Sequence, residues 1–357
     1  MKGLHGGNIA EIARGCNIAQ TSIVDFSASI NPLGMPPAAK EAYLKAIDSV
    51  KRYPDNESFG LIRALSMYHD LPSQNILAGN GSTEFIYLIP RILRPERSLV
   101  VIPTFSEYDA ALRQSKGRID YFELREEEEF MLDISQLLTK LRCGYDSLWI
   151  GNPGNPTGGL IGNEKMTEIL MEAERLGITC IIDEAFMDFS EEESIKGEVA
   201  NLDNLIVLRS MTKFFALAGL RVGYIIGSEN LIGRLKNEKE PWSLNSPGQA
   251  TATASLADGS YREESLKLIE KEREFLYEGV RSVSFLKPFP SRANFILSKL
   301  EKGIKSGELQ KALLKKFSIL VRDCGNFHGL DGEFIRMAVN KRRENTLLLK
   351  ALRSCNL

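Results

Sequence analysis

Three short apolar segments, each followed by a polar side chain, constrain how this chain folds more than any other feature of its sequence. The polar side chains are Asn155, Asp183 and Lys213, which are 28 residues (155 to 183) and 30 residues (183 to 213) apart. Each interval fits one strand–helix–strand step. Ligands of open α/β sheets bind at the carboxyl ends of strands. The spacing therefore predicts that these three groups share one edge of a sheet.

The pattern of apolar runs predicts a large lobe with an α/β architecture. Apolar segments alternate with amphipathic stretches, which favours a mainly parallel sheet with helices on both faces. The expected strands lie near 99–102, 147–150, 179–183, 204–208 and 222–226, with helices between them such as 85–93 and 164–176.

A second, smaller α/β lobe is predicted at the C-terminal end. A long charged helix over 259–284 bridges to it, and the expected elements there are strands at 294–297, 319–322 and 333–339 and a helix over 306–317. We therefore expect an N-terminal arm over 1–36 that packs with the small lobe, a large domain over 37–250, and a small domain over 251–357.

The composition excludes several classes of protein. The 357 residues carry 45 basic and 47 acidic side chains, a net charge of −2, which favours neither nucleic acid nor membrane as a partner. Five scattered cysteines form no CxxC pair and three histidines are far apart, so we expect reduced thiols, a cytoplasmic location and no metal site. The acidic runs 125–129 and 191–193 are interpreted as solvated loops.

The segment around Lys213 has the residue types of a cofactor site. A lysine in a low-polarity pocket loses its proton readily and can then attack a carbonyl group. Ser210 and Arg221 nearby are suited to binding a phosphate. With Asp183 to keep a pyridine nitrogen protonated and Asn155 to bond a ring hydroxyl, the set suits pyridoxal 5′-phosphate. A solvated lysine at a strand end is the alternative for Lys213 alone.

These motifs, in this order, resemble the fold-type I pyridoxal-phosphate enzymes. Within them the chain is similar to the histidinol-phosphate aminotransferase branch and, most of all, to the threonine-phosphate decarboxylases of cobalamin biosynthesis. The resemblance runs from His5 to Asn340. It implies a homodimer whose active site is completed by the neighbouring subunit.

The resemblance also implies roles for further cofactor-binding residues. The turn Gly81-Ser82-Thr83 before a helix matches the family's phosphate loop, although an ordinary helix cap explains it equally. Tyr108 matches the aromatic ring that lies against the pyridine, with a core aromatic as the alternative. Tyr53 matches the tyrosine that crosses to the neighbour's cofactor phosphate. The full expected set is Gly81, Ser82, Thr83, Tyr108, Asn155, Asp183, Ser210, Thr212, Lys213, Arg221 and Tyr53, of which Lys213, Asp183 and Tyr108 are assigned to catalysis.

A second set is expected to bind a phosphorylated amino acid. The opening His5-Gly6-Gly7 resembles the substrate-phosphate clasp of the decarboxylases, and a flexible terminus is the alternative interpretation. Arg336, in an apolar strand, matches the arginine for the substrate carboxylate. Asn31, Asn155 and Arg322 complete this set. A strand cap for Arg322 and an internal ion pair for Arg336 are the alternatives.

Two features favour decarboxylation of O-phospho-L-threonine to (R)-1-amino-2-propanol phosphate over transamination of histidinol phosphate. Typical aminotransferases of this branch lack the His-Gly-Gly-Asn opening. Phe186 stands where they generally have a tyrosine that bonds the cofactor hydroxyl. The sequence does not separate threonine phosphate from serine phosphate, which differ by one methyl group. A binding protein without catalysis is disfavoured by the intact site, and a Rossmann dehydrogenase by the lack of a GxGxxG turn.

Overall fold

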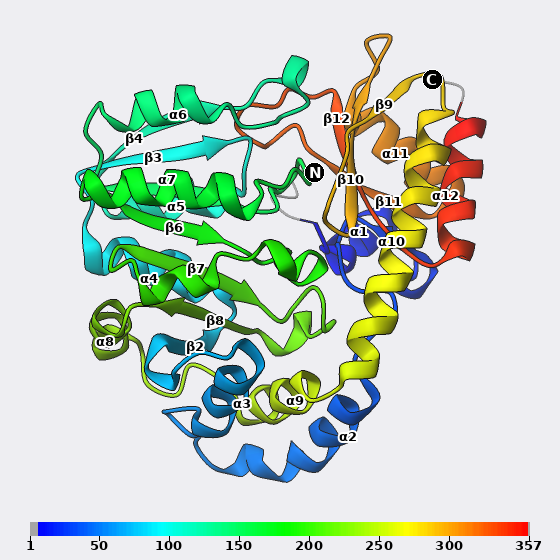
Figure 1. Ribbon diagram of the computed structural model, residues 1–357. Helices are drawn as coiled ribbons and strands as arrows, with labels where there is room; N and C mark the ends of the chain where they lie inside the picture. The colour runs from blue at the N-terminus through cyan, green and yellow to red at the C-terminus, as the bar shows by residue number, and fades with distance from the viewer. Residues whose placement is uncertain (1–5, 356–357) are drawn as a thin grey trace.

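The computed structural model describes residues 6–355, which form two lobes joined by one long helix (Figure 1). A seven-stranded sheet organises the large lobe, in the order β2-β8-β7-β6-β5-β3-β4. Its strands are β2 (Ile76–Asn80), β3 (Arg97–Ile102), β4 (Arg118–Glu123), β5 (Ser147–Gly151), β6 (Thr179–Asp183), β7 (Leu205–Ser210) and β8 (Val222–Gly227). Pairing is parallel from β7 to β4, whereas β8 runs antiparallel to both of its neighbours.

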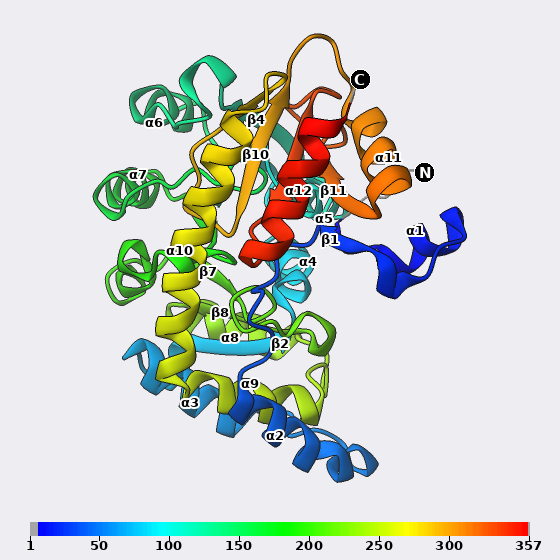
Figure 2. The same cartoon turned by 90° about the vertical axis from the view of Figure 1, so that its right-hand side faces the viewer.

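Helices cover both faces of this sheet, because successive side chains of each strand point to opposite faces. Trp149, Ile181 and Ile206 pack on one face with α4, α5 and α8, and Leu148 and Ile182 pack on the other with α6 and α7. Figure 2 shows these two helical layers. The helices are α4 (Ser82–Leu93), α5 (Ser106–Gln114), α6 (Ile134–Leu141), α7 (Asn163–Arg175) and α8 (Glu229–Glu238).

The small lobe contains a five-stranded sheet in the order β1-β11-β12-β10-β9. Its strands are β1 (Val24–Phe26), β9 (Leu286–Pro288), β10 (Phe295–Leu300), β11 (Ile319–Asp323) and β12 (Phe334–Ala338), and its helices are α11 (Ser306–Phe317) and α12 (Arg342–Ser354). The edge strand β1 comes from the N-terminal segment and pairs in parallel with β11. The small α1 (Ile9–Cys16) packs beside α11 through Ile12 and Leu314.

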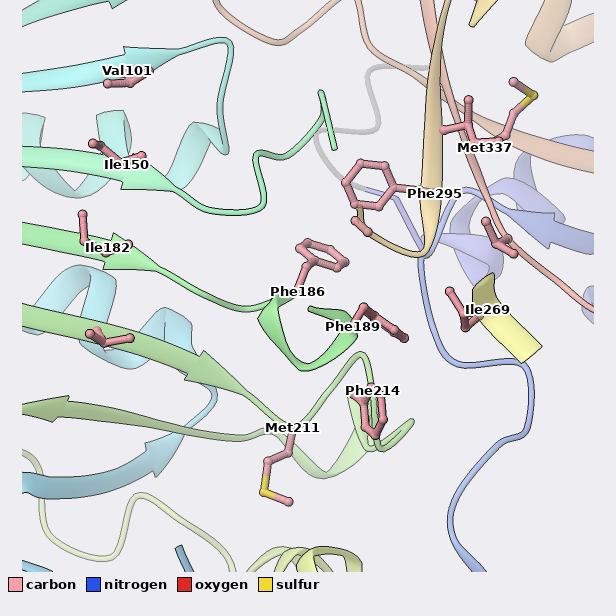
Figure 3. Packing of buried hydrophobic residues seen from close by; sticks show 14 of the residues in the cluster. Val101, Ile150, Ile182, Phe186, Phe189, Met211, Phe214, Ile269, Phe295 and Met337 are labelled. Atoms are coloured by element: carbon pink, nitrogen blue, oxygen red, sulfur yellow. The ribbon is translucent and has the colours of Figure 1, made fainter. Parts of the chain in front are cut away.

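Helix α10 (Gly259–Arg281) connects the two lobes. It follows α9 (Ser246–Leu256), which packs on α2 (Pro37–Ala46) and α3 (Phe59–His69) at the end of the large lobe away from the small sheet. Aromatic rings also join the lobes directly, since Phe186 of the large lobe meets Phe295 of the small lobe with ring centroids 5.0 Å apart (Figure 3). The lobes therefore share one continuous apolar core.

The predicted strands and helices match this fold within a few residues, with two exceptions. The sequence interpretation did not identify the strands β1, β2, β4 and β9. The acidic run 191–193 is also not a fully solvated loop, because the Glu191 side chain is only 11% exposed and pairs with Arg209. Cys180 is buried in β6. No helix within residues 6–355 is long and apolar enough to cross a membrane.

Candidate active site

A cavity of about 230 Å³ lies at the carboxyl edge of the large sheet, where that edge faces the small lobe. Strands β5, β6 and β7 end there side by side, with Gly151 paired to Asp183 and Asp183 to Leu208. The structure brings twelve of the predicted site residues to the wall of this cavity. They are Gly6, Ser82, Thr83, Tyr108, Asn155, Asp183, Ser210, Thr212, Lys213, Arg221, Arg322 and Arg336.

Lys213 follows β7 and faces the cavity beside positive charges. Burial, with the nearby guanidinium groups of Arg336 and Arg221, lowers the pKa of its amine from 10.5 to about 8, and Asp183 offsets part of this shift. A lower pKa leaves more of the amine neutral near physiological pH, and the neutral amine is the nucleophile.

Asp183 ends β6 at the floor of the cavity. Its Oδ2 accepts a 2.6 Å hydrogen bond from the Tyr108 hydroxyl, and its Oδ1 accepts a 2.9 Å bond from the backbone N–H of Ala185. Burial raises the pKa of Asp183, whereas these two donors and the charge of Lys213 lower it. The donors thus favour the ionised carboxylate that a protonated pyridine nitrogen requires. The face-on contact of Tyr108 with the ring stays a prediction.

One end of the cavity has the features of a phosphate site. Ser82 and Thr83 begin α4, so unpaired backbone N–H groups of its first turn and the helix dipole favour an anion there. The hydroxyls of Ser210 and Thr212 lie 2.7 Å apart opposite this turn. A Cβ at Gly81 would lie 2.7 Å from Nη2 of Arg221, so a glycine is needed for the guanidinium to approach the turn.

The other end contains two arginines from the small lobe. Arg322 on β11 and Arg336 on β12 are direct partners in the antiparallel pair, and both are buried, with exposed fractions of 5% and 6%. Like charges at directly opposite positions of a sheet are destabilising. Burial, together with the charge of Arg322, lowers the pKa of Arg336 from 12.5 to about 10. An anion between the two guanidinium groups would relieve this repulsion.

Asn155 lies between the two ends of the cavity. Its Oδ1 accepts a hydrogen bond from Nη1 of Arg336. Nη2 of the same arginine donates to the backbone carbonyl of Ser27 at 2.9 Å. These acceptors carry no formal charge, so they orient Arg336 without neutralising it.

Four of the predicted residues are not in the wall of this cavity. The amide nitrogen of Asn31 donates to the Phe214 carbonyl at 2.8 Å and to the Ser265 hydroxyl at 2.7 Å, so Asn31 holds the backbone next to Lys213, and its role toward the substrate stays a prediction. Tyr53 is 80% exposed at the end of the large lobe. Gly7 lies behind Gly6, and Gly81 behind the α4 turn. His5 lies outside the described residues.

The sequence interpretation missed several residues of the cavity wall, among them Ser27, Phe105, Asn326 and Phe327. Nη2 of Arg322 donates to Oδ1 of Asn326 at 2.6 Å, and its guanidinium carbon lies 5.2 Å from the ring centroid of Phe327. Both residues come from the loop after β11. Their position, four and five residues after a candidate anion-binding arginine, is the one signal that could have drawn attention to them.

A largely buried ion-pair network lies outside the cavity. Arg209 of β7 contacts Glu184 at 3.0 Å and Asp188 at 3.2 Å, and it also pairs with Glu191. Tyr224 in turn hydrogen-bonds Nε2 of His69 at 2.7 Å. Because Arg209 faces three carboxylates of the protein itself, we assign the network to structure and not to ligand binding.

The residues of the cavity fit pyridoxal phosphate. Lys213 offers a depressed-pKa amine for the aldehyde, Asp183 a buried carboxylate for the pyridine nitrogen, and the α4 turn with Arg221 an anion site for the phosphate. Each functional group of the cofactor has a counterpart of the right charge.

Residues 21–352 match the family model described as aminotransferase class I and II, and the chain belongs to that family, whose members depend on pyridoxal phosphate. It is 38% identical over 354 residues to the threonine-phosphate decarboxylase of Salmonella typhimurium, covering 98% of this chain and 96% of that protein.

Two solved structures share the fold. One is the histidinol-phosphate aminotransferase of Clostridium acetobutylicum (TM-score 0.86, 36% identity, 93% of this chain and 98% of that chain). The other is the L-threonine-O-3-phosphate decarboxylase of Porphyromonas gingivalis (TM-score 0.83, 26% identity, 93% and 99%). Overall similarity therefore does not separate the two reactions.

Proposed function

We propose that the protein decarboxylates O-phospho-L-threonine to CO₂ and (R)-1-amino-2-propanol phosphate. The observation that carries this proposal is the pair of buried arginines, Arg322 and Arg336, opposite each other on neighbouring strands. A substrate with a carboxylate and a phosphate supplies one anion for each guanidinium. The 38% identity to a threonine-phosphate decarboxylase supports the same substrate.

The residues of the cavity have separate roles in binding the cofactor and the substrate. Lys213, Asp183, Asn155 and Arg221 hold the cofactor, which when bound accepts the electron pair released as a bond at the substrate Cα breaks. Arg336 binds the substrate carboxylate, and Arg322 with the N-terminal arm binds its phosphate. By fixing the orientation of the substrate, Arg336 and Arg322 would determine which bond at Cα breaks. Lys213 then gives Cα the proton that replaces CO₂.

Phe186 supports decarboxylation over transamination. Its ring lines the cavity and its centroid is 5.7 Å from Nζ of Lys213. A phenylalanine donates no hydrogen bond to the cofactor hydroxyl, so Asn155 is left as the donor on that side. The family resemblance implies a tyrosine at this position in aminotransferases, and we infer that its absence belongs to the decarboxylase site.

The deciding experiment is incubation of the cofactor-loaded protein with O-phospho-L-threonine while CO₂ and the amino-alcohol phosphate are measured. We expect equal amounts of both products. O-phospho-L-serine is the next comparison, because one methyl group changes the rate by only roughly 10–200-fold. If no CO₂ appears and glutamate forms from histidinol phosphate and 2-oxoglutarate, the protein is an aminotransferase.

We also propose that two copies of the chain form a dimer through the end of the large lobe. Large apolar side chains are exposed there on and beside α2 and α3, with exposed fractions between 47% and 80%. They are Leu44, Ile47, Val50, Tyr53, Phe59, Met67 and Trp242. Tyr53 and Trp242 lie with ring centroids 4.7 Å apart. Large apolar side chains exposed together at one end of a lobe favour burial against a protein partner.

The position of Tyr53 supports a role in the neighbour's site. It is 80% exposed and does not line the cavity of its own chain. Mixing the inactive variants Tyr53→Ala and Lys213→Ala tests this role. If Tyr53 acts across the interface, mixed dimers contain one complete site and activity returns on mixing. Activity that stays absent in dimers shown to have exchanged subunits would contradict the proposal.

A further inference from the structure

The turn Asp25–Ser27 joins two parts of the candidate substrate site that are distant in sequence. Ser27 is only 2% exposed and follows directly on β1. It lines the active-site cavity and also a second cavity of about 1200 Å³ between α1 and α11. Its hydroxyl and its carbonyl contact different partners.

The hydroxyl of Ser27 holds the N-terminal arm. The backbone N–H of Gly7 donates to Ser27 Oγ at 2.9 Å. A Cβ at Gly6 would lie 2.1 Å from the Ser27 carbonyl oxygen, a distance that no side chain tolerates. The arm therefore lies directly on Ser27, and the glycine at position 6 permits that contact.

The carbonyl of Ser27 holds the arginine assigned to the substrate carboxylate. Nη2 of Arg336 donates to this oxygen at 2.9 Å. Arg336 is itself buried, and it also donates a hydrogen bond to Asn155. A shift of the Ser27 backbone is consequently transmitted to the guanidinium.

Asp25 fixes the conformation of Ser27. Oδ1 of Asp25 accepts from the Ser27 hydroxyl at 2.6 Å and from the Ser27 backbone N–H at 2.7 Å. Since the hydroxyl proton points at Asp25, a lone pair of Oγ is directed to Gly7. Asn340 donates to the Asp25 carbonyl at 3.1 Å, which ties the turn to the end of β12.

We propose that Ser27, oriented by Asp25, is a positioning residue that couples the N-terminal arm to Arg336, so that an anion bound at the arm strengthens binding of the substrate carboxylate. The proposal rests on the proposed function, which assigns phosphate to the arm with Arg322 and carboxylate to Arg336. It adds that the two anion sites are thermodynamically linked through one serine.

The test separates the two halves of the substrate. The holoenzyme is titrated with L-threonine, followed by the cofactor absorbance, with and without saturating inorganic phosphate. We expect phosphate to increase the affinity for threonine by roughly fivefold or more. In Ser27→Ala this ratio should fall toward one, while threonine alone binds nearly as before because the backbone carbonyl remains.

Matched variants keep the test decisive. Ser27→Thr retains a hydroxyl and should restore the coupling. Ser29 is in the same segment and is 1% exposed, and its hydroxyl has no hydrogen-bond partner within residues 6–355. The control variant Ser29→Ala removes this hydroxyl and should leave the coupling intact. If Ser27→Ala does not fold, Asp25→Asn should show a reduced ratio.

Two results would overturn the proposal: a wild-type protein in which phosphate leaves threonine affinity unchanged, or full coupling in Ser27→Ala or Asp25→Asn. The readout needs no turnover, so it is independent of whether CO₂ is released. Failure of the proposed reaction and failure of the coupling are therefore distinguishable.

Discussion

Two groups of buried arginines in this molecule have opposite surroundings. Arg209 is completely buried among the carboxylates of Glu184, Asp188 and Glu191. Arg336 is almost as buried, but its hydrogen bonds go to the neutral groups of Asn155 and Ser27, and its direct partner on the neighbouring strand is a second arginine, Arg322. Burial alone therefore does not identify a binding arginine. A binding arginine is identified by a positive charge that the carboxylates of the protein itself do not neutralise.

The same difference explains how each group affects stability. A buried ion pair with good geometry repays much of the desolvation of its charges, and breaking it is strongly destabilising. Two like charges on neighbouring strands destabilise the fold until an anion arrives. Arg209 and its carboxylates stabilise the fold, whereas the pair of Arg322 and Arg336 lowers stability in favour of ligand binding.

The largest expected effect is the loss of catalysis when Lys213, which lines the same cavity as Arg322 and Arg336, is replaced. Lys213→Ala should lower kcat by on the order of 10³-fold or more, because the amine both holds the cofactor and moves the proton at Cα. Its free energy of unfolding without cofactor should not fall by more than about 1 kcal/mol, since a buried cation is removed. Steady-state kinetics and urea unfolding of the cofactor-free protein measure the two. A large loss of stability would remove the contrast with Arg209.

Arg209→Met should destabilise the protein by about 3–5 kcal/mol, because three carboxylates lose their buried partner. Guanidinium-chloride unfolding of the variant against the wild type measures this difference. The fraction that remains folded should bind the substrate with an unchanged KM. An unfolding free energy within 1 kcal/mol of the wild type would show that the network is not structural.

The matched change Arg336→Met should have the opposite profile. We expect KM for O-phospho-L-threonine to rise by roughly 10–100-fold, since a charge-assisted hydrogen bond is worth about 1.5–3 kcal/mol. The unfolding free energy should change little or increase, because the repulsion with Arg322 is removed. Arg336→Lys retains the charge but not the bidentate geometry and should recover only part of the affinity. A destabilisation as large as that of Arg209→Met would contradict the comparison.

The smallest effect is a shift in pH dependence. Burial and the two nearby arginines lower the pKa of Lys213 to about 8, so the neutral amine accumulates as the pH rises through that value. Capture of pyridoxal phosphate by the cofactor-free protein, trapped with borohydride, should therefore speed up with a midpoint near pH 8. In Arg336→Met the midpoint should move upward because one positive charge is lost. A midpoint near the ordinary value of about 10.4 would show a solvated lysine.

Sequence reasoning located the large lobe and the cofactor end of the site because both depend on local patterns. The strands that flank Asp183 and Lys213 are buried on both faces and read as continuous apolar runs. Strand β4 (Arg118–Glu123) escaped notice because its side chains are half-buried or exposed at a sheet edge. Strand β2 is short and ends in Ala-Gly-Asn, which resembles a turn.

The remaining features that sequence reasoning missed are contacts between distant segments. Nothing near Asn31 in the sequence shows that its amide bonds Phe214 and Ser265, and nothing near Glu191 shows Arg209. Ser27 looks like an ordinary polar residue until Gly7 and Arg336 are placed on either side of it. Such partners are set by the tertiary fold, and a single sequence does not display them.

The pairing of β1 with β11 has a consequence for the order in which the protein is made. Val24 lies opposite Ile319, so a strand synthesised among the first residues waits for almost the whole chain before its partner leaves the ribosome. The large sheet, in contrast, contains only residues between 76 and 227 and can assemble earlier. The turn at Ser27 is next to β1. The substrate end of the site is therefore completed last, after a lobe able to hold the cofactor has been synthesised.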